Sequence, residues 1–182
     1  MTKAKILQPD LILGDTIVTL TPDILKFYNL RGLILDVDET LVPLQEKEAS
    51  AELRHWVETI RPLVSIWLVS NNVSDGRIGS IARSLDLPYI IGAVKPSRRK
   101  LRQALDAMSL PPERVAMVGD RLFTDVLAGN RLGMVTILVE PMIDPAVATS
   151  RYPIRNFEVW ISRQLGVSLA KTQHNFTNDD KS

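Results

Sequence analysis

The chain has 182 residues, 45% of them hydrophobic, which is enough for one domain with a substantial core. Its 22 Lys and Arg residues nearly balance 21 Asp and Glu residues, so a formal net charge of +1 gives no overall basic excess that would favour nucleic-acid binding. The absence of cysteine excludes disulfides, thiolate metal ligands and a cysteine nucleophile.

The hydrophobic segments are too short to cross a membrane. In the opening "MTKAKILQPDLILGD", Pro9 and Asp10 interrupt the apolar run before it could form the core of a signal peptide, and no later segment approaches about 18 continuous apolar residues. We therefore expect a cytoplasmic protein, with a peripheral position at a membrane surface still open.

The predicted elements alternate between helix and strand along the chain. The first helix begins with Thr21 as N-cap and Pro22 in its first turn, and it ends near Gly32. The run 33–37 that follows is apolar on successive residues, which is typical of a strand covered on both faces. Further helices are predicted at 49–60, 77–87, 97–110 and 122–133, and further strands at 63–70, 88–96, 114–120 and 134–140.

This alternation predicts an α/β fold, a Rossmann-like parallel sheet with helices on both faces. We divide the chain into an N-terminal extension and helix packed on the core (1–32), the core itself (33–166) and a polar, disordered tail (167–182). The segment 40–63 has room for little beyond one helix, and the segment 71–94 is used by a helix and a short strand, so no cap domain is expected.

Polar side chains stand at or just after the ends of the predicted strands. They are Asp36 and Asp38, Ser70 and Asn71, Lys95, and Asp120 with Asp125. In an open parallel sheet the carboxyl ends of the strands meet at one edge, where ligands bind, so we expect these groups to lie together.

Such a group of carboxylates repels itself unless a cation keeps it ionised. Mg²⁺ is the natural candidate because it prefers oxygen ligands and often binds through one or two carboxylates and a substrate phosphate. Asp36 and Asp38 point the same way if the chain stays extended, and two such carboxylates can act as nucleophile and as proton carrier. Thr40 is expected to hydrogen-bond the turn that follows.

Each motif is weak by itself, because aspartates, serine and asparagine are common in turns and caps. An EF-hand calcium loop counted from Asp36 fails, since its sixth position is Leu41 instead of glycine and its twelfth is Lys47 instead of glutamate. The joint occurrence of the polar groups, in order and each at a strand end, is what favours a site.

The segments "LILDVDETL", "IWLVSNN", "VKP" and "VAMVGDRLFTD" resemble the four ordered motifs of haloacid-dehalogenase-type phosphatases. The resemblance implies an Mg²⁺-dependent phosphatase with an aspartyl-phosphate intermediate. It implies that Asp36 is the nucleophile and Asp38 the general acid and base, and that Lys95 neutralises phosphate and carboxylate charge. It further implies that phosphate is bound by Ser70 and Lys95, with Asn71 beside Ser70. It also implies a metal site formed by Asp36, Asp120 and the main-chain carbonyl of Asp38, with Asp125 as a direct or supporting group. Glu39 stands where relatives often have Gly or Asn.

A closer resemblance covers residues 7–165 and points to subfamily IIIA, the YqeG-like group related to phosphatidylglycerophosphate phosphatases. It favours a lipid phosphate substrate such as phosphatidylglycerophosphate, and an uncapped site also suits a large substrate. Two groups of basic residues could face anionic lipid; the first is Lys95, Arg98, Arg99, Lys100 and Arg102, and the second is Arg151, Arg155 and Arg163. The apolar residues Phe27, Tyr28 and Leu30 are further candidates for membrane contact. A solvated helix face explains the basic residues equally well.

Other functions stay open. A soluble phosphorylated metabolite, a nucleotide or a protein is the alternative substrate, and nothing in the sequence sets the oligomeric state. A phospho-acceptor module of receiver type also combines acids and a lysine, but it would carry the acceptor aspartate where this chain has Ser70. A binding protein without catalysis would not need Asp36, Asp38, Lys95 and Asp120 together.

Overall fold

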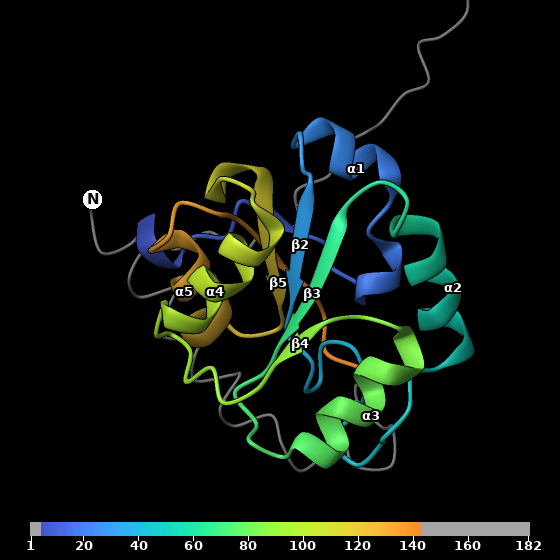
Figure 1. The fold of residues 1–182 in the computed structure, drawn as a ribbon. Coiled ribbons are helices and arrows are strands. Elements are labelled where there is room, and N and C mark those ends of the chain that lie inside the picture. The colour runs from blue at the N-terminus through green and yellow to red at the C-terminus, as the bar shows by residue number, and fades with distance from the viewer. Residues whose placement is uncertain (1–4, 143–182) are drawn as a thin grey trace, which may run out of the picture.

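A computed structural model describes residues 5–142 and contains a six-stranded parallel sheet with the strand order β1-β6-β5-β2-β3-β4 (Figure 1). The strands are β1 (Leu11–Ile12), β2 (Gly32–Leu35), β3 (Ser65–Val69), β4 (Tyr89–Ile90), β5 (Val115–Gly119) and β6 (Val135–Leu138). The α-helices are α1 (Pro22–Phe27), α2 (Ala51–Ile60), α3 (Asp75–Leu85), α4 (Arg99–Met108) and α5 (Leu127–Asn130). Short 3₁₀ turns lie at Lys5–Leu7, Ile17–Thr19 and Pro112–Arg114.

Helices cover both faces of the sheet, with α2 and α3 on one side and α4 and α5 on the other (Figure 1). Side chains of β2 alternate between the two faces, as the pleat of a strand requires. Leu33 and Leu35 join the core formed with α1, α2 and α3, whereas Ile34 joins the core formed with α4 and α5. The predicted α/β fold with helices on both faces is therefore confirmed.

The centre of the sheet is β2, which pairs with β5 on one side and β3 on the other. All four of its residues are buried, so the strand is held on both edges and both faces. This position explains the uninterrupted apolar run in the sequence, and it makes the end of β2 a rigid place to attach reactive groups.

The N-terminal segment contributes an edge strand that the sequence did not reveal. β1 is two residues long and pairs with β6, and the Asp10 carboxylate accepts hydrogen bonds from Thr136 N (2.8 Å) and Thr136 Oγ1 (3.0 Å). The predicted division of the chain at residue 32 stays a prediction, and the predicted tail at 167–182 lies outside the described residues.

The helix predicted at 122–133 has two parts. Residues Leu122–Val126 form a π-helical turn, with Val126 N bonded to Arg121 O (3.3 Å), and α5 continues from Leu127. Such wide turns occur often at functional sites, because they re-aim one side chain without ending the helix. Among residues 5–142, none of the helices has the length and hydrophobicity that a membrane crossing requires.

Candidate active site

The two aspartates of "DVDET" begin immediately beyond β2, at the carboxyl ends of the strands. Asp36 N still donates to Val118 O of β5 (2.9 Å), so the sheet fixes the first aspartate. The chain then turns sharply, with Glu39 N bonded to Val42 O (2.9 Å) and Glu39 in the left-handed region at φ 64°.

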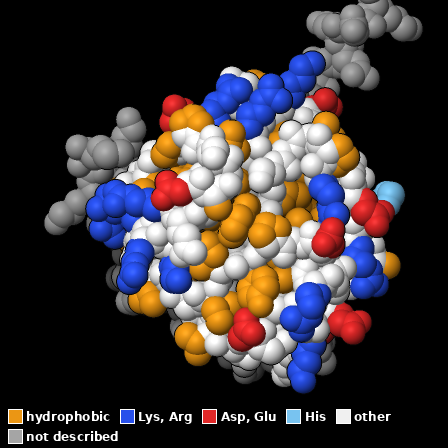
Figure 2. All heavy atoms as spheres, viewed as in Figure 1, with side chains coloured by type: hydrophobic (Ala, Val, Ile, Leu, Met, Phe, Trp, Pro, Cys, Tyr) orange, Lys and Arg blue, Asp and Glu red, His pale blue; other side chains and the backbone are white. Residues whose placement is uncertain are grey.

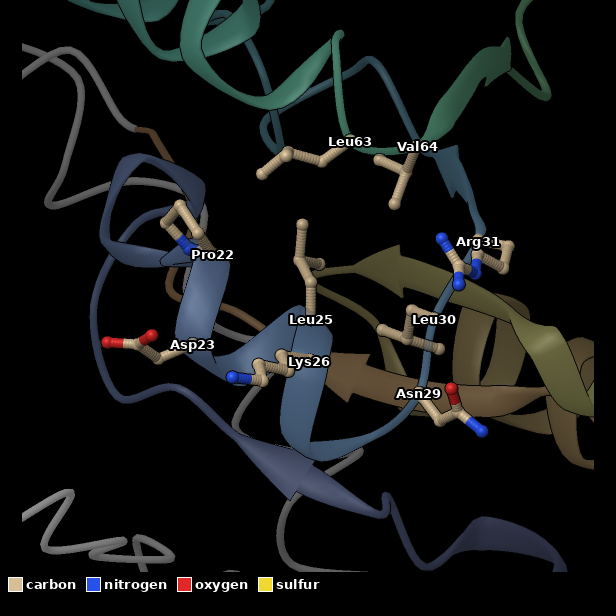
Figure 3. Close-up of a pocket in the computed structure, with 9 residues that line it drawn as sticks. All are labelled: Pro22, Asp23, Leu25, Lys26, Asn29, Leu30, Arg31, Leu63 and Val64. Carbon is tan, nitrogen blue, oxygen red and sulfur yellow. The ribbon is translucent and has the colours of Figure 1, made fainter. Parts of the chain in front are cut away.

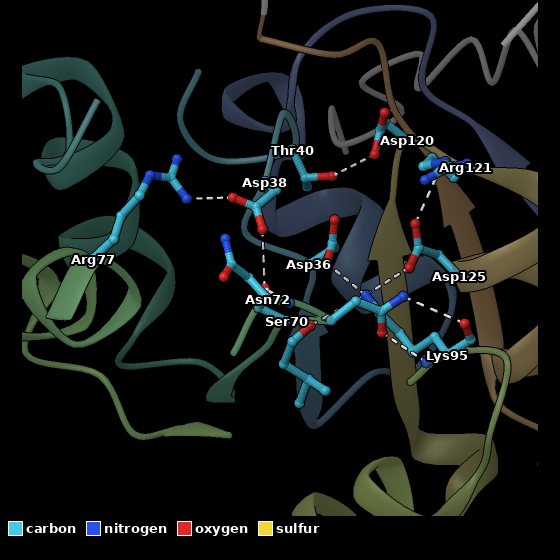
Figure 4. Close-up of polar contacts among 12 residues, drawn as sticks. Asp36, Asp38, Thr40, Ser70, Asn72, Arg77, Lys95, Asp120, Arg121 and Asp125 are labelled. Carbon is cyan, nitrogen blue, oxygen red and sulfur yellow. Dashed lines mark hydrogen bonds and ion pairs between the residues drawn. The ribbon is translucent and has the colours of Figure 1, made fainter. Parts of the chain in front are cut away.

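Lys95 lies at the centre of the site, with 1% of its side chain exposed (Figure 4). Its Nζ is 2.5 Å from Asp36 Oδ1 and 2.7 Å from Asp125 Oδ1, and it also donates to Val69 O (3.1 Å). One ammonium group thus links the last residue of β3 with residues that follow β2 and β5. A buried ion pair of this kind needs all its partners, because an unpaired buried charge is costly.

Three carboxylates form a group that could hold a metal ion. Asp36, Asp120 and Asp125 each offer one oxygen, and these oxygens lie within 4.8 Å of one another. Asp38 lies beside this group with its carboxylate turned to Ser70 and Arg77. Asp36, Asp38 and Asp125 pair with two cations, Lys95 and Arg77, so the four carboxylates, when all are ionised, carry two negative charges in excess of these cations. An all-oxygen donor set with that excess fits a hard divalent cation.

Burial raises the pKa of two of these carboxyls. Loss of solvation raises the pKa of Asp36 to about 7; the Lys95 charge opposes this shift and the Asp125 charge adds to it. Loss of solvation, with the charges of Asp125 and Asp36, raises the pKa of Asp120 to about 8. Burial alone would lower the pKa of Lys95, but Asp125 and Asp36 outweigh it and raise that pKa. Without a further cation, Asp36 and Asp120 are therefore partly protonated near neutral pH.

Ser70 and Asn71 lie at the end of β3, as predicted, but face different partners. Ser70 Oγ donates to Asp38 Oδ2 (3.1 Å) and accepts from Asn72 N (2.9 Å). The Asn71 side chain binds the main chain of Lys95, accepting from its N–H (2.6 Å) and donating to its carbonyl (3.3 Å). Asn71 therefore holds in place the loop that carries Lys95.

Two contacts in the site were not predicted. Arg77 of α3 pairs with Asp38 and donates from Nε to Glu46 O and from Nη2 to Pro43 O, both at 2.9 Å. Thr40 donates to Asp120 Oδ1 (3.2 Å), so it connects the turn to the carboxylate after β5. A basic residue in the first turn of the helix after "SNN" was the available signal for Arg77, because such a turn starts at the same edge of the sheet.

Comparison with known proteins shows the family of this chain. Residues 93–155 match the HAD-hydrolase-like family. The probable phosphatase YqeG of Bacillus subtilis is 35% identical over 156 residues, which cover 85% of this chain and 87% of that protein. The chain belongs to the haloacid dehalogenase (HAD) superfamily.

A more distant sequence relative is also named as a phosphatase, and a solved structure shares the fold. The mitochondrial phosphatidylglycerophosphatase GEP4 of Saccharomyces cerevisiae is 29% identical over 76% of this chain and 80% of that protein. A HAD family enzyme from Bacteroides thetaiotaomicron, solved as a magnesium complex, superposes with a TM-score of 0.52 at 8% identity, covering 68% of this chain and 100% of that one. The protein is a phosphatase that acts on phosphorylated substrates, and phosphatases of this superfamily generally use a divalent metal.

A pocket of about 310 Å³ lies far from the carboxylates of the HAD site. It opens at the amino ends of β2 and β3 and is lined by apolar Leu25, Leu30, Leu63 and Val64 with Lys26 and Arg31 at its edge (Figure 3). Two of the residues considered for membrane contact, Phe27 and Leu30, belong to this end, and Leu30 is buried whereas Phe27 is 59% exposed. Arg151, Arg155 and Arg163 lie outside the described residues.

Proposed function

We propose that the protein is a Mg²⁺-dependent phosphomonoesterase that forms an aspartyl-phosphate on Asp36 and acts on a phospholipid such as phosphatidylglycerophosphate. The observation that carries the mechanism is the single Lys95 ammonium held between Asp36 and Asp125, beside the carboxylate of Asp120. This arrangement supplies a nucleophile, a fixed positive charge and an acidic group in one place.

The proposed steps use residues at the carboxyl edge of the sheet. Asp36 attacks phosphorus in line as the bond to the leaving oxygen breaks, and Asp38 in its protonated form gives its proton to the departing alkoxide. Water then hydrolyses the acyl phosphate, with Asp38 taking up its proton. Lys95 and the Ser70 hydroxyl stabilise negative charge on the phosphoryl oxygens, where most of the catalysis of phosphoryl transfer resides.

The metal would bind among the carboxylates at the strand ends. Asp36, Asp120 and the main-chain carbonyl of Asp38 would hold Mg²⁺, with Asp125 as a further or supporting ligand. Bound there, it would neutralise the excess carboxylate charge and polarise the substrate phosphate. Lys95 pairs with both Asp36 and Asp125 and so holds two of these carboxylates close together.

The lipid substrate is supported by two observations. The likeness to GEP4 extends over most of both chains. Within the described residues, β2 is followed by a turn and α2 and β3 by α3, so no separate domain encloses a small substrate over the site. Enclosed sites favour small metabolites, whereas an open edge accepts a headgroup still attached to its membrane.

A phosphate-release panel tests this function. Phosphatidylglycerophosphate in mixed micelles should be hydrolysed faster than phosphosugars, nucleotides or phosphopeptides, and chelation of Mg²⁺ should stop release. Asp36→Asn should reduce turnover by at least about 10⁴-fold, because the nucleophile is lost. Glu48→Asn, an exposed acid outside the site, serves as the matched control and should leave turnover unchanged.

The outcomes separate mechanism from substrate. Full activity of Asp36→Asn, or activity independent of any divalent metal, would contradict the mechanism. If the protein prefers a soluble phosphate and its activity still requires both Asp36 and a divalent metal, that soluble phosphate replaces the lipid as the proposed substrate. Stable phosphorylation of Asp36 without turnover would instead favour a phospho-acceptor module.

A further inference from the structure

Two exposed valines stand beside the site, at the carboxyl edge of the sheet. Val73 is 78% exposed and follows the "SNN" segment after β3, and Val94 is 71% exposed and immediately precedes Lys95. Two more large apolar side chains among the described residues are similarly exposed, Phe27 (59%) and Leu63 (46%), and both lie at the opposite end of the sheet. We call Val73 and Val94 the valine rim.

The two loops that carry the valine rim are fastened to each other. Gly92 N donates to Asn72 O (2.9 Å), Ala93 N donates to Ser70 O (3.0 Å), and the Asn71 side chain bonds both main-chain groups of Lys95. A Cβ at Gly92 would lie 3.6 Å from Val73 Cγ1, so the first valine packs directly over the second loop. The rim is therefore part of a rigid platform attached to the catalytic lysine.

Val94 is held exposed in a conformation that costs energy. Its φ of 51° lies in the left-handed region, which a β-branched residue rarely adopts. Asparagine or glycine would fit this backbone better and would also be less costly in contact with water. An exposed valine in such a conformation is more easily explained by contact with an apolar partner than by folding.

A basic cluster lies next to the valine rim. It consists of Arg98, Arg99, Lys100, Arg102 and Arg131, of which Arg99, Arg102 and Arg131 are exposed. Arg131 Nη1 donates to Pro96 O (3.1 Å) and Arg98 Nη1 donates to Arg131 O (3.3 Å), which places these cations against the loop that carries Val94. With the residues that the structure describes, the cluster forms no ion pair. Figure 2 shows hydrophobic side chains, Lys or Arg side chains and a few Asp or Glu side chains interspersed over the lower part of the molecule.

The exposed side of the catalytic group faces the same edge. Asp38 keeps 21% of its side chain exposed, against 10% for Asp36 and 1% for Asp125, and its carboxylate accepts from Ser70, the residue that begins the loop of Val73. Because Asp38 is the most exposed of these three carboxylates, we expect a phosphate to reach Asp36 from this edge. Whatever binds the valine rim and the basic cluster is therefore next to the entrance of the site.

We propose that the valine rim and the basic cluster form the surface by which this phosphatase docks on an anionic phospholipid membrane, with its strand ends facing the lipid. This inference rests on the lipid substrate proposed above. Valines enter the apolar part of the interface, cations bind the anionic headgroups, and the substrate phosphate meets Asp36 without leaving the membrane. The apolar pocket at the amino ends of β2 and β3 then faces away from the membrane.

Vesicle sedimentation of the full chain tests the surface. Wild type should bind vesicles of phosphatidylcholine with phosphatidylglycerol and should bind phosphatidylcholine alone much more weakly. Val73→Ser with Val94→Asn should lower binding about tenfold by removing the apolar contact. Arg99→Gln with Arg102→Gln should lower it by about fivefold per cation. Asn also suits the backbone of residue 94, so loss of folding would not explain the result.

Matched controls come from other parts of the surface. Phe27→Ser with Leu63→Ser removes two exposed apolar side chains at the opposite end of the sheet, and Arg54→Gln removes an exposed cation on α2. These variants should bind vesicles as wild type does. The proposal would be overturned if the rim variants and the control variants lost vesicle binding equally, or if the rim variants bound vesicles as well as wild type does.

A second readout separates this proposal from the catalytic one. The rim variants should hydrolyse a water-soluble aryl phosphate at the wild-type rate and lose hydrolysis of lipid phosphate in vesicles. A wild type that hydrolyses the soluble phosphate but ignores anionic vesicles would overturn the docking surface, point to a partner other than lipid and leave the mechanism standing. A wild type that binds vesicles through the rim but hydrolyses nothing would support the surface and overturn the mechanism.

Discussion

At the scale of single residues, Glu39 illustrates how the site depends on an unfavourable backbone. Its left-handed φ of 64° allows the turn after Asp38 in which Thr40 reaches Asp120, and its main chain bonds Val42 O and Met142 N. An ordinary residue in this region costs about 1–2 kcal/mol. This backbone suits Gly or Asn better than Glu.

Glu39→Asn should therefore stabilise the protein. Asn adopts the left-handed region more readily, and we expect the free energy of unfolding to rise by about 0.5–1 kcal/mol. Urea denaturation measures the change. Glu48→Asn removes the same charge from an exposed position without a positive φ and should not stabilise the chain; an equal gain there would show that charge, and not backbone conformation, is responsible.

At the scale of elements, the π-helical turn after β5 and the end of β5 fit together closely. Asp125 from this turn reaches back to Lys95, and its other oxygen accepts from Arg121 N (3.2 Å). The carboxyl group of Asp125 occupies the space beside Gly119, where a Cβ would lie 2.4 Å from Asp125 Cγ. Glycine at the end of β5 is thus required by the position of the aspartate.

Gly119→Ala should destabilise the fold and the site together. The methyl group must displace Asp125 from Lys95, and we expect a loss of about 3 kcal/mol in unfolding free energy with a large fall in turnover. Thermal unfolding and phosphate release measure the two effects. Gly76→Ala in α3 is the matched control, because a Cβ there meets nothing within 4 Å, and it should raise stability by up to about 1 kcal/mol. Tolerance of alanine at 119 would show that Asp125 can move without consequence.

At the scale of the whole molecule, stability and metal binding should depend on pH in opposite directions. The pKa values of Asp36 and Asp120 are raised to about 7 and about 8 in the folded protein, against about 4 for an unperturbed aspartate. Between these values the folded state holds more protons than the unfolded state. Stability from these two groups is therefore present below about pH 4 and is lost as the pH rises toward 8.

Mg²⁺ should reverse this trend, because it binds the deprotonated carboxylates. We expect Mg²⁺ to raise the Tm more at about pH 8 than at about pH 5, and to release protons on binding near pH 7. Differential scanning calorimetry with and without Mg²⁺ checks this expectation. Asp120→Asn should remove most of the metal effect; a metal-induced rise in Tm that is equal at both pH values would contradict the link to these carboxylates.

Much of the fold and the positions of the site residues could be predicted, but three parts could not. The apolar run before Asp36 predicted the central strand, since few other environments accept such a run. β1 has only two residues, too few for a periodic pattern, and becomes a strand because β6 offers it a free edge. The π-helical turn and the pairing of Arg77 with Asp38 depend on neighbours distant in the sequence.

From Pro22 onward, the sequence by itself determined the alternation of strands and helices, the parallel sheet and the edge at which Asp36, Asp38, Ser70, Lys95 and Asp120 meet, because these follow from local periodicity and the rules of parallel topology. Only the tertiary structure decided which carboxylates pair with Lys95 and which pair with Arg77. Lys95 and Asp36 are 59 residues apart along the chain, and their separation of 2.5 Å is set by how β2, β3 and β4 pair and how the loops after β2 and β4 pack. Distances of this kind decide pKa values and metal fit, and no local pattern contains them.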